Sequence, residues 1–267
     1  MPTLLIAFLA VMLYASAALH QALALNRLVP MRPRLIQCVG ALAVLCHAII
    51  VYNSLAAHGG LHVGLFESAS LIAWLIALTL LLVSLFRPVL AAATGLFPLA
   101  ALSVTGVVGL PSPMVESSFP PGLIIHIVTS TLAYAFLMIA AGQAILIALQ
   151  TQALKRHRIR GIIQVLPPLT SMERLMFQLI ICGMVLLTAS LISGAVTLDH
   201  LVARHLAHKT GLSVLAWLIF GGLLWGRYQR GWRGPRAIRW TLAGVAVLLL
   251  AYFGSKFVLE IMLHRSW

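Results

Sequence analysis

The chain has 267 residues, of which 61% are hydrophobic and only 9% are charged. A soluble fold of this length does not need so many apolar residues, and the apolar runs are continuous rather than alternating. The composition therefore predicts an all-α, polytopic membrane helix bundle. The net charge of +13 lies in short segments beside the apolar runs. That pattern is typical of membrane topology and contact with anionic lipid, and it argues against a nucleic-acid partner.

We predict about eight transmembrane spans in a single membrane domain, residues 1–267. The first arginine follows the N-terminal apolar run, which predicts a retained span rather than a cleaved signal peptide. A capping-box pattern from Thr170 to Glu173 predicts that the sixth span starts near Met172. Pro98 predicts a bend in the fourth. The expected spans cover residues 3–25, 36–56, 68–86, 89–110, 122–150, 172–198, 211–226 and 240–262.

The basic residues predict the orientation of these spans. If eight spans alternate, fourteen of the 18 lysines and arginines fall on one side; the other side has Arg204, Lys209, Lys256 and Arg265. The positive-inside rule then places the larger group in the cytoplasm and both termini outside. The fifth span would enter the membrane from the outer face.

The expected fifth span carries His126 about one turn from its outer end, with Ser130 and Tyr134 at i+4 and i+8 on the same helix face. An ionisable residue inside a span is costly and normally has a partner in the bundle interior. On position alone, His126 can be a hydrogen-bonded structural residue, a proton relay, or an axial ligand of a metal or haem. His47, near the middle of the second span, leaves similar alternatives, including a hydrogen bond to a hydroxyl such as that of Tyr134.

Several stretches in the second half of the chain resemble the cytochrome c assembly family, the haem-handling membrane proteins of the CcsA, CcmC and CcmF type. They are GLIIHIVTSTLAYAFLMIAAG, LPPLTSMERLMFQLIICGMVLLTASLISGA, and KTGLSVLAWLIFGGLLWGRYQRGWRGPRA followed by GVAVLLLAYFGSKF. The small eight-span branch, the YpjD-like proteins, is more similar still, since it shares the Cys46-His47 pair, the length and the span count. The resemblance implies a multi-pass protein of the bacterial inner (plasma) membrane.

The resemblance also implies a cofactor. In this family the helix-borne histidine at the outer face is an axial haem ligand, a role that falls on His126 and implies non-covalently bound haem b. His264, in MLHRSW, lies one residue from the position of a second family histidine, and His47 is the other candidate for the opposing ligand. Ser130 and Tyr134 are expected to support His126 from the same helix face. Lys209 and Arg204 are available for the haem propionates.

Two family features are absent, and they limit the expected function. The tryptophan-rich W-W-D segment is replaced by DHLVARHLAHKT, and a histidine of the penultimate helix falls on Trp225. We therefore expect a haem-binding factor that assists cytochrome c assembly at the outer face, together with apocytochrome c or other assembly proteins, and is not a complete haem lyase. The alternative is a transporter, or a subunit of one, for haem, a metal ion or a small solute; its only hints are Pro98 and Glu260.

Other chemistry has little support in the sequence. No Ser-His-acid set, phosphate loop or paired carboxylates occur, so we expect neither an enzyme nor any catalytic residue. The three cysteines form no C-x-x-C and predict neither a disulfide framework nor covalent haem attachment. The outer-loop histidines can hold zinc or copper, or can be solvated loop residues; they are His200, His205 and His208.

Overall fold

The computed structural model describes residues 2–56, 64–110, 121–156, 165–197 and 207–254. Within this part, eight helical stretches are long and apolar enough to cross a membrane, which confirms the predicted all-α membrane class. The elements are α1 (Pro2–Leu25), α2 (Pro33–Ala56), α3 (Leu65–Ser84), η2 (Leu90–Ala92), α4 (Ala93–Gly109), α5 (Pro121–Lys155), α6 (Leu169–Thr197), α8 (Ala207–Arg230), α9 (Pro235–Leu249) and η4 (Leu250–Gly254).

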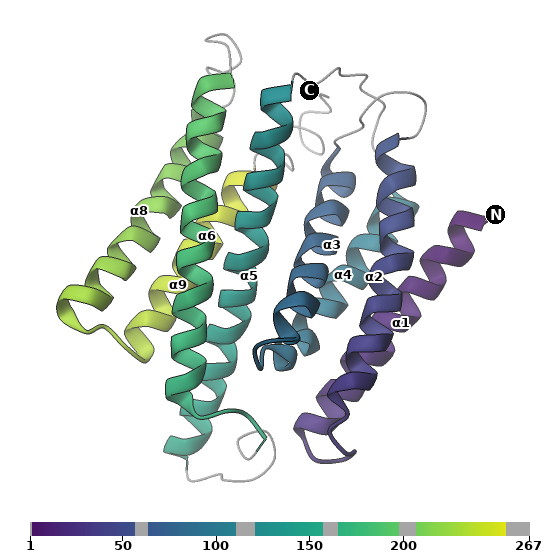
Figure 1. Ribbon diagram of the computed structural model, residues 1–267, viewed down its shortest axis with the longest axis horizontal. Helices are drawn as coiled ribbons and strands as arrows, with labels where there is room; N and C mark the ends of the chain where they lie inside the picture. Colours follow the sequence, from purple (N-terminus) through teal and green to yellow (C-terminus); the bar gives the residue numbers. More distant parts are fainter. Residues whose placement is uncertain (1, 57–63, 111–120, 157–164, 198–206, 255–267) are drawn as a thin grey trace.

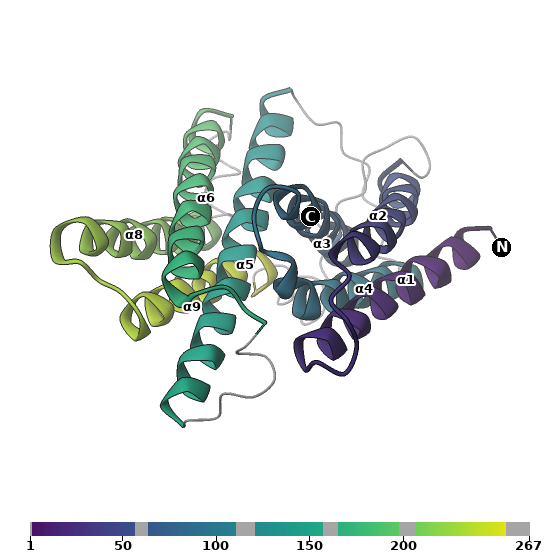
Figure 2. The ribbon, with the colours of Figure 1, turned by 60° about the horizontal axis from the view of Figure 1, so that its bottom comes forward.

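The helices alternate in direction and form two groups (Figure 1). Helices α1 to α4 pack on one another, and α5, α6, α8 and α9 form the second group. Helix α5 joins them, because it packs against α3, η2 and α4 as well as against α6 and α9. Figure 2 shows α8 at the edge of the bundle, on the far side of α5 from α1.

Small residues bring α5 and α6 close together. Buried alanines such as Ala133 and Ala140 leave room for a neighbouring helix, which is how membrane helices commonly pack. On α6, a Cβ at Gly183 would lie 2.6 Å from Cγ of Leu137. Glycine is therefore required for this approach, and the pairing fixes which residues of the two helices face each other near His126.

Basic side chains gather at one end of the bundle, hereafter the arginine end. It lies at the bottom of Figure 1, where α1 is joined to α2, α3 to η2 and α8 to α9, and where α5 ends and α6 begins. Of the thirteen lysines and arginines described, twelve lie at this end and Lys209 lies at the other. The helix directions thus agree with the predicted charge split, while the cytoplasmic location of the arginine end stays a prediction.

The predicted capping box at the start of the sixth span is wrong. Helix α6 begins at Leu169, and the carboxylate of Glu173 is used in a tertiary contact instead: its Oε1 accepts a hydrogen bond of 2.7 Å from the backbone N–H of Gly234. The contact fixes the turn between α8 and α9 against α6. Two segments that carry the family resemblance, 166–195 and 209–237, are therefore joined by one hydrogen bond.

The seventh and eighth spans are also longer toward the arginine end than predicted. Helix α8 continues to Arg230 and α9 begins at Pro235, a favourable first helical residue, so most of the predicted basic loop is helical. Arginines there make cation–π contacts with aromatic rings: the guanidinium of Arg227 lies 4.8 Å from the ring centroid of Phe177. Toward the opposite end, α9 passes into the π-helix η4, and residues 255–267 lie outside the described part.

Pro98 lies inside α4, which continues as one helix from Ala93 to Gly109. The broken helix that would favour a carrier is therefore not found at this position. Glu260, the other hint of a transporter, lies outside the described residues.

Candidate functional site

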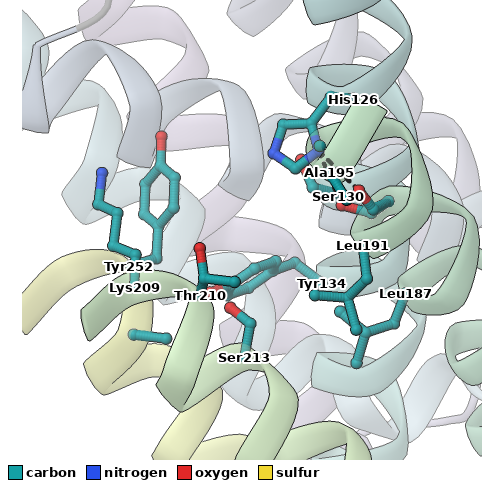
Figure 3. A pocket seen from close by; sticks show the side chains of 13 residues that line it. His126, Ser130, Tyr134, Leu187, Leu191, Ala195, Lys209, Thr210, Ser213 and Tyr252 are labelled. Atoms are coloured by element: carbon teal, nitrogen blue, oxygen red, sulfur yellow. Dashed lines mark hydrogen bonds between the residues drawn. The ribbon is translucent and has the colours of Figure 1, made fainter. Parts of the chain in front are cut away.

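A cavity of about 290 Å³ lies between α5, α6, α8 and η4, at the end of the bundle away from the arginine end. Its volume is close to the lower limit of roughly 300 Å³ for small-ligand sites. His126, Ser130 and Tyr134 line it from α5, as the sequence predicted from their helical spacing. Figure 3 shows His126 on one side of the cavity and the side chains of Lys209 and Tyr252 on the other.

The imidazole of His126 is held by one ring nitrogen. Its Nδ1 lies 2.8 Å from the backbone carbonyl oxygen of Ser190 on α6, and 3.3 Å from the hydroxyl of the same residue. A carbonyl oxygen only accepts hydrogen bonds, so Nδ1 carries a proton, and in the neutral imidazole Nε2 then keeps its lone pair. In Figure 3 the second ring nitrogen is on the side toward Lys209 and Tyr252. This arrangement is typical of metal-ligating histidines, in which the other nitrogen donates to a carbonyl.

Gly194 makes the position of this imidazole possible. It lies one helical turn after Ser190 on α6, and a Cβ there would be 3.0 Å from both Cε1 and Nδ1 of His126. Ser190 and Gly194 were not predicted as site residues from the sequence. Their i, i+4 spacing places the Ser190 carbonyl and the side-chain-free Gly194 on the same face of α6. Only the packing of α6 on α5 shows that this face contacts His126.

Tyr134 and Ser130 face the same cavity but make their hydrogen bonds elsewhere. The Tyr134 hydroxyl donates to the carbonyl of Leu248, at 2.5 Å, just before the π-helix η4. The Ser130 hydroxyl donates to the carbonyl of Ile127 in its own helix, at 3.0 Å. The bond thus links α5 to the end of α9, and the Tyr134 ring centroid lies 5.8 Å from that of Tyr252 in η4. Ser130 adds a polar oxygen to the cavity wall.

The wall opposite His126 is cationic and aromatic. Nζ of Lys209, on α8, lies 5.5 Å from the ring centroid of Tyr252. Tyr252 belongs to the π-helix, a distortion that often occurs at functional sites. Among the described lining residues, Lys209 is the one lysine or arginine, so this part of the cavity combines an apolar wall, an imidazole and a positive charge.

His47 lies apart from this cavity, among α1, α2 and α3. It is 0% exposed, and both ring nitrogens have hydroxyl partners: Nδ1 is 3.2 Å from Tyr14 and Nε2 is 2.9 Å from Ser70. No lone pair is left for a metal while this network is intact. The geometry therefore favours the structural alternative for His47, with partners on α1 and α3 in place of the suggested Tyr134.

The remaining predicted histidines cannot be placed relative to this cavity. His264, His200 and His205 lie outside the described residues, as does the side chain of His208. Within the described part of the chain, no group of three or more His, Cys, Asp or Glu could hold a metal ion. All three cysteines are described, and each is a free thiol.

The sequence comparisons identify the class of this membrane protein. The sequence model described as Cytochrome C assembly protein matches residues 35–263. The chain therefore belongs to the cytochrome c assembly protein family, and the resemblance inferred from its motifs is confirmed. The match includes all the elements that line the His126 cavity.

Individual relatives agree with this assignment. Inner membrane protein YpjD of Escherichia coli (strain K12) is 32% identical over 230 residues, which cover 83% of this chain and 85% of that protein. Cytochrome c biogenesis protein CcsA of Parasynechococcus marenigrum is 26% identical over 230 residues, 75% of each chain. No solved structure is significantly similar to this chain. With its eight membrane-length helices, the chain is a multi-pass inner-membrane protein.

The family handles haem, and the cavity fits one end of such a group. The lone pair of His126 Nε2 suits an axial position on iron, the lining is mainly apolar, and Lys209 can neutralise a propionate. A macrocycle is wide and flat, so a cavity of about 290 Å³ would enclose part of it. Among the described lining residues, His126 is the histidine that could supply an axial ligand.

Proposed function

We propose that this protein is a haem-binding assembly factor that presents haem b at the outer face of the inner membrane for cytochrome c maturation. The observation that carries the proposal is the orientation of His126, with Nδ1 bonded to the Ser190 carbonyl and Nε2 toward the cavity. His126 would ligate the iron, Lys209 would pair with a propionate, and the apolar wall would limit the access of water. A bound haem would supply the prosthetic group that cytochrome c maturation requires.

The chain itself would bind and orient haem without catalysing its attachment. Its sequence lacks the tryptophan-rich segment that presents haem in larger family members. Covalent attachment would then need apocytochrome c and other assembly proteins. Co-expression with a C-x-x-C-H substrate in cells without their own maturation system should give no holocytochrome on a haem-stained gel; a haem-stained band would contradict this part of the proposal.

The visible spectrum of protein purified in mild detergent tests the haem site. We expect a Soret band that His126→Ala largely removes, and that added imidazole partly restores by filling the vacated ligand position. His47→Ala is the matched control, because it removes another intramembrane histidine whose ring nitrogens are both occupied. It should retain haem per mole of folded protein. His264→Ala tests the predicted second ligand by the same spectrum.

The outcomes separate the alternatives. If His126→Ala keeps the wild-type Soret band per mole of folded protein, His126 is not a ligand and has a structural role. If His47→Ala loses the band and imidazole restores it, the ligand assignment moves to the other group of helices. A sample that never contains haem, but gains stability with a metal ion, would favour the transport alternative.

A further inference from the structure

A second cavity, of about 250 Å³, lies at the arginine end of the bundle. One wall is the connection that follows α3, at Arg87 and Pro88, and the other comes from the first turns of α6, including Ser171, Arg174 and Gln178. This is the opposite end of the bundle from His126. An inference about it therefore does not depend on the proposed haem function.

The lining of this second cavity is positively charged. Arg87 and Arg174 contribute two guanidinium groups, and none of the described lining residues is acidic. Glu173 is the one acidic residue described at the arginine end, and its carboxylate accepts the hydrogen bond from Gly234. Helix α6 begins at Leu169, so the positive end of a 29-residue helix dipole lies beside the cavity.

The two guanidinium groups have no partner among the described residues. Other arginines at the same end lie over aromatic rings, at 4.8 to 5.3 Å from the ring centroids; they are Arg227, Arg230 and Arg236. Arg87 and Arg174 are exposed, and the described structure gives their side chains no hydrogen bond, ion pair or ring contact. Two arginines that converge on one cavity without an acid are suited to an anion.

From this arrangement we infer that the cavity binds the phosphate of an anionic phospholipid headgroup. Basic pockets between membrane helices are known to bind such headgroups. Arg87, Arg174, the Ser171 hydroxyl and the Gln178 amide are the available donors. The residues immediately before Arg87 favour a lipid over a soluble phosphate, because Leu85 and Phe86 are 61% and 84% exposed and offer an apolar surface for acyl chains.

Native mass spectrometry of the full chain, titrated with phosphatidylglycerol or phosphatidylcholine, tests this inference. The wild type should bind phosphatidylglycerol in preference to phosphatidylcholine. Arg87→Gln/Arg174→Gln should weaken phosphatidylglycerol binding by roughly 30-fold, the loss expected for two basic residues near an anionic headgroup. Arg32→Gln/Arg34→Gln is the matched control, since it removes two exposed arginines at the same end that do not line the cavity.

Three outcomes would overturn the inference. The first is an equal loss in both double variants, which would mean that net charge alone attracts the lipid. The second is no loss in the Arg87/Arg174 variant. The third is displacement of phosphatidylglycerol by inorganic phosphate at a comparable concentration, which would make the site one for soluble anions. If the glutamine variant does not fold, Arg87→Lys/Arg174→Lys keeps both charges and should show an intermediate affinity; wild-type affinity in that variant would refute guanidinium recognition.

Discussion

Gly194→Ala is the sharpest perturbation of the His126 site. The added methyl carbon would lie 3.0 Å from Cε1 and Nδ1 of His126, which is closer than the ordinary contact range of 3.4–4 Å. The imidazole must therefore move by a few tenths of an ångström, and its 2.8 Å bond to the Ser190 carbonyl must lengthen or bend. The carbonyl belongs to the backbone, so this substitution reaches a contact that side-chain removal cannot.

We expect Gly194→Ala to weaken the affinity for haem and to leave the free energy of unfolding nearly unchanged. Loss of the contact that orients a metal-ligating histidine typically costs 10–100-fold in affinity, so we expect haem binding to weaken by about that factor. Alanine is about 1 kcal/mol more favourable than glycine inside a helix, which should offset the crowding in the free energy of unfolding. The assay is haem titration followed at the Soret band, beside thermal unfolding of the apoprotein.

Gly95→Ala on α4 is the control for this substitution, because a Cβ there would meet nothing within 4 Å. It should leave haem affinity unchanged. If Gly194→Ala binds haem as tightly as the wild type, with an unchanged spectrum, the orientation of His126 does not matter for haem. The arrangement of His126, Ser190 and Gly194 would then have a packing role only.

Three further predictions concern the His47 network, the Glu173 bond and the membrane topology. His47→Ala should lower the free energy of unfolding by about 1–2 kcal/mol, because two interhelical hydrogen bonds are lost; unchanged thermal unfolding would refute the importance of that network. Glu173→Gln should destabilise the turn between α8 and α9 by about 1–2 kcal/mol, since a charge-assisted bond to the Gly234 N–H becomes a neutral one. Faster proteolysis within residues 231–234 would reveal it, and wild-type proteolysis would contradict it. Reporter fusions should place 151–170 and 227–239 in the cytoplasm and 111–121 and 199–210 outside; an outside signal from 227–239 would overturn the topology.

The sequence determined the class of the protein and the helix face that carries His126. Long, continuous apolar runs predict transmembrane helices. In lipid the backbone N–H and C=O groups have no water to bond, and a helix satisfies them within its own segment. Helical periodicity then placed Ser130 and Tyr134 beside His126. These inferences depend on local spacing and composition, which the chain carries without reference to its neighbours.

The partners of these residues were decided only by tertiary packing. The Ser190 carbonyl that fixes the His126 proton is a backbone group, so no residue type signals it, and it meets His126 because small residues let α6 approach α5 closely. The ring nitrogens of His47, on α2, are both hydrogen-bonded because α1 brings Tyr14 and α3 brings Ser70 against this helix. The Glu173 carboxylate accepts a hydrogen bond from the Gly234 backbone N–H and does not cap the start of α6, because the packing of α6 brings that N–H within reach. Side-chain partners across helices depend on rotation and register, which local sequence does not specify.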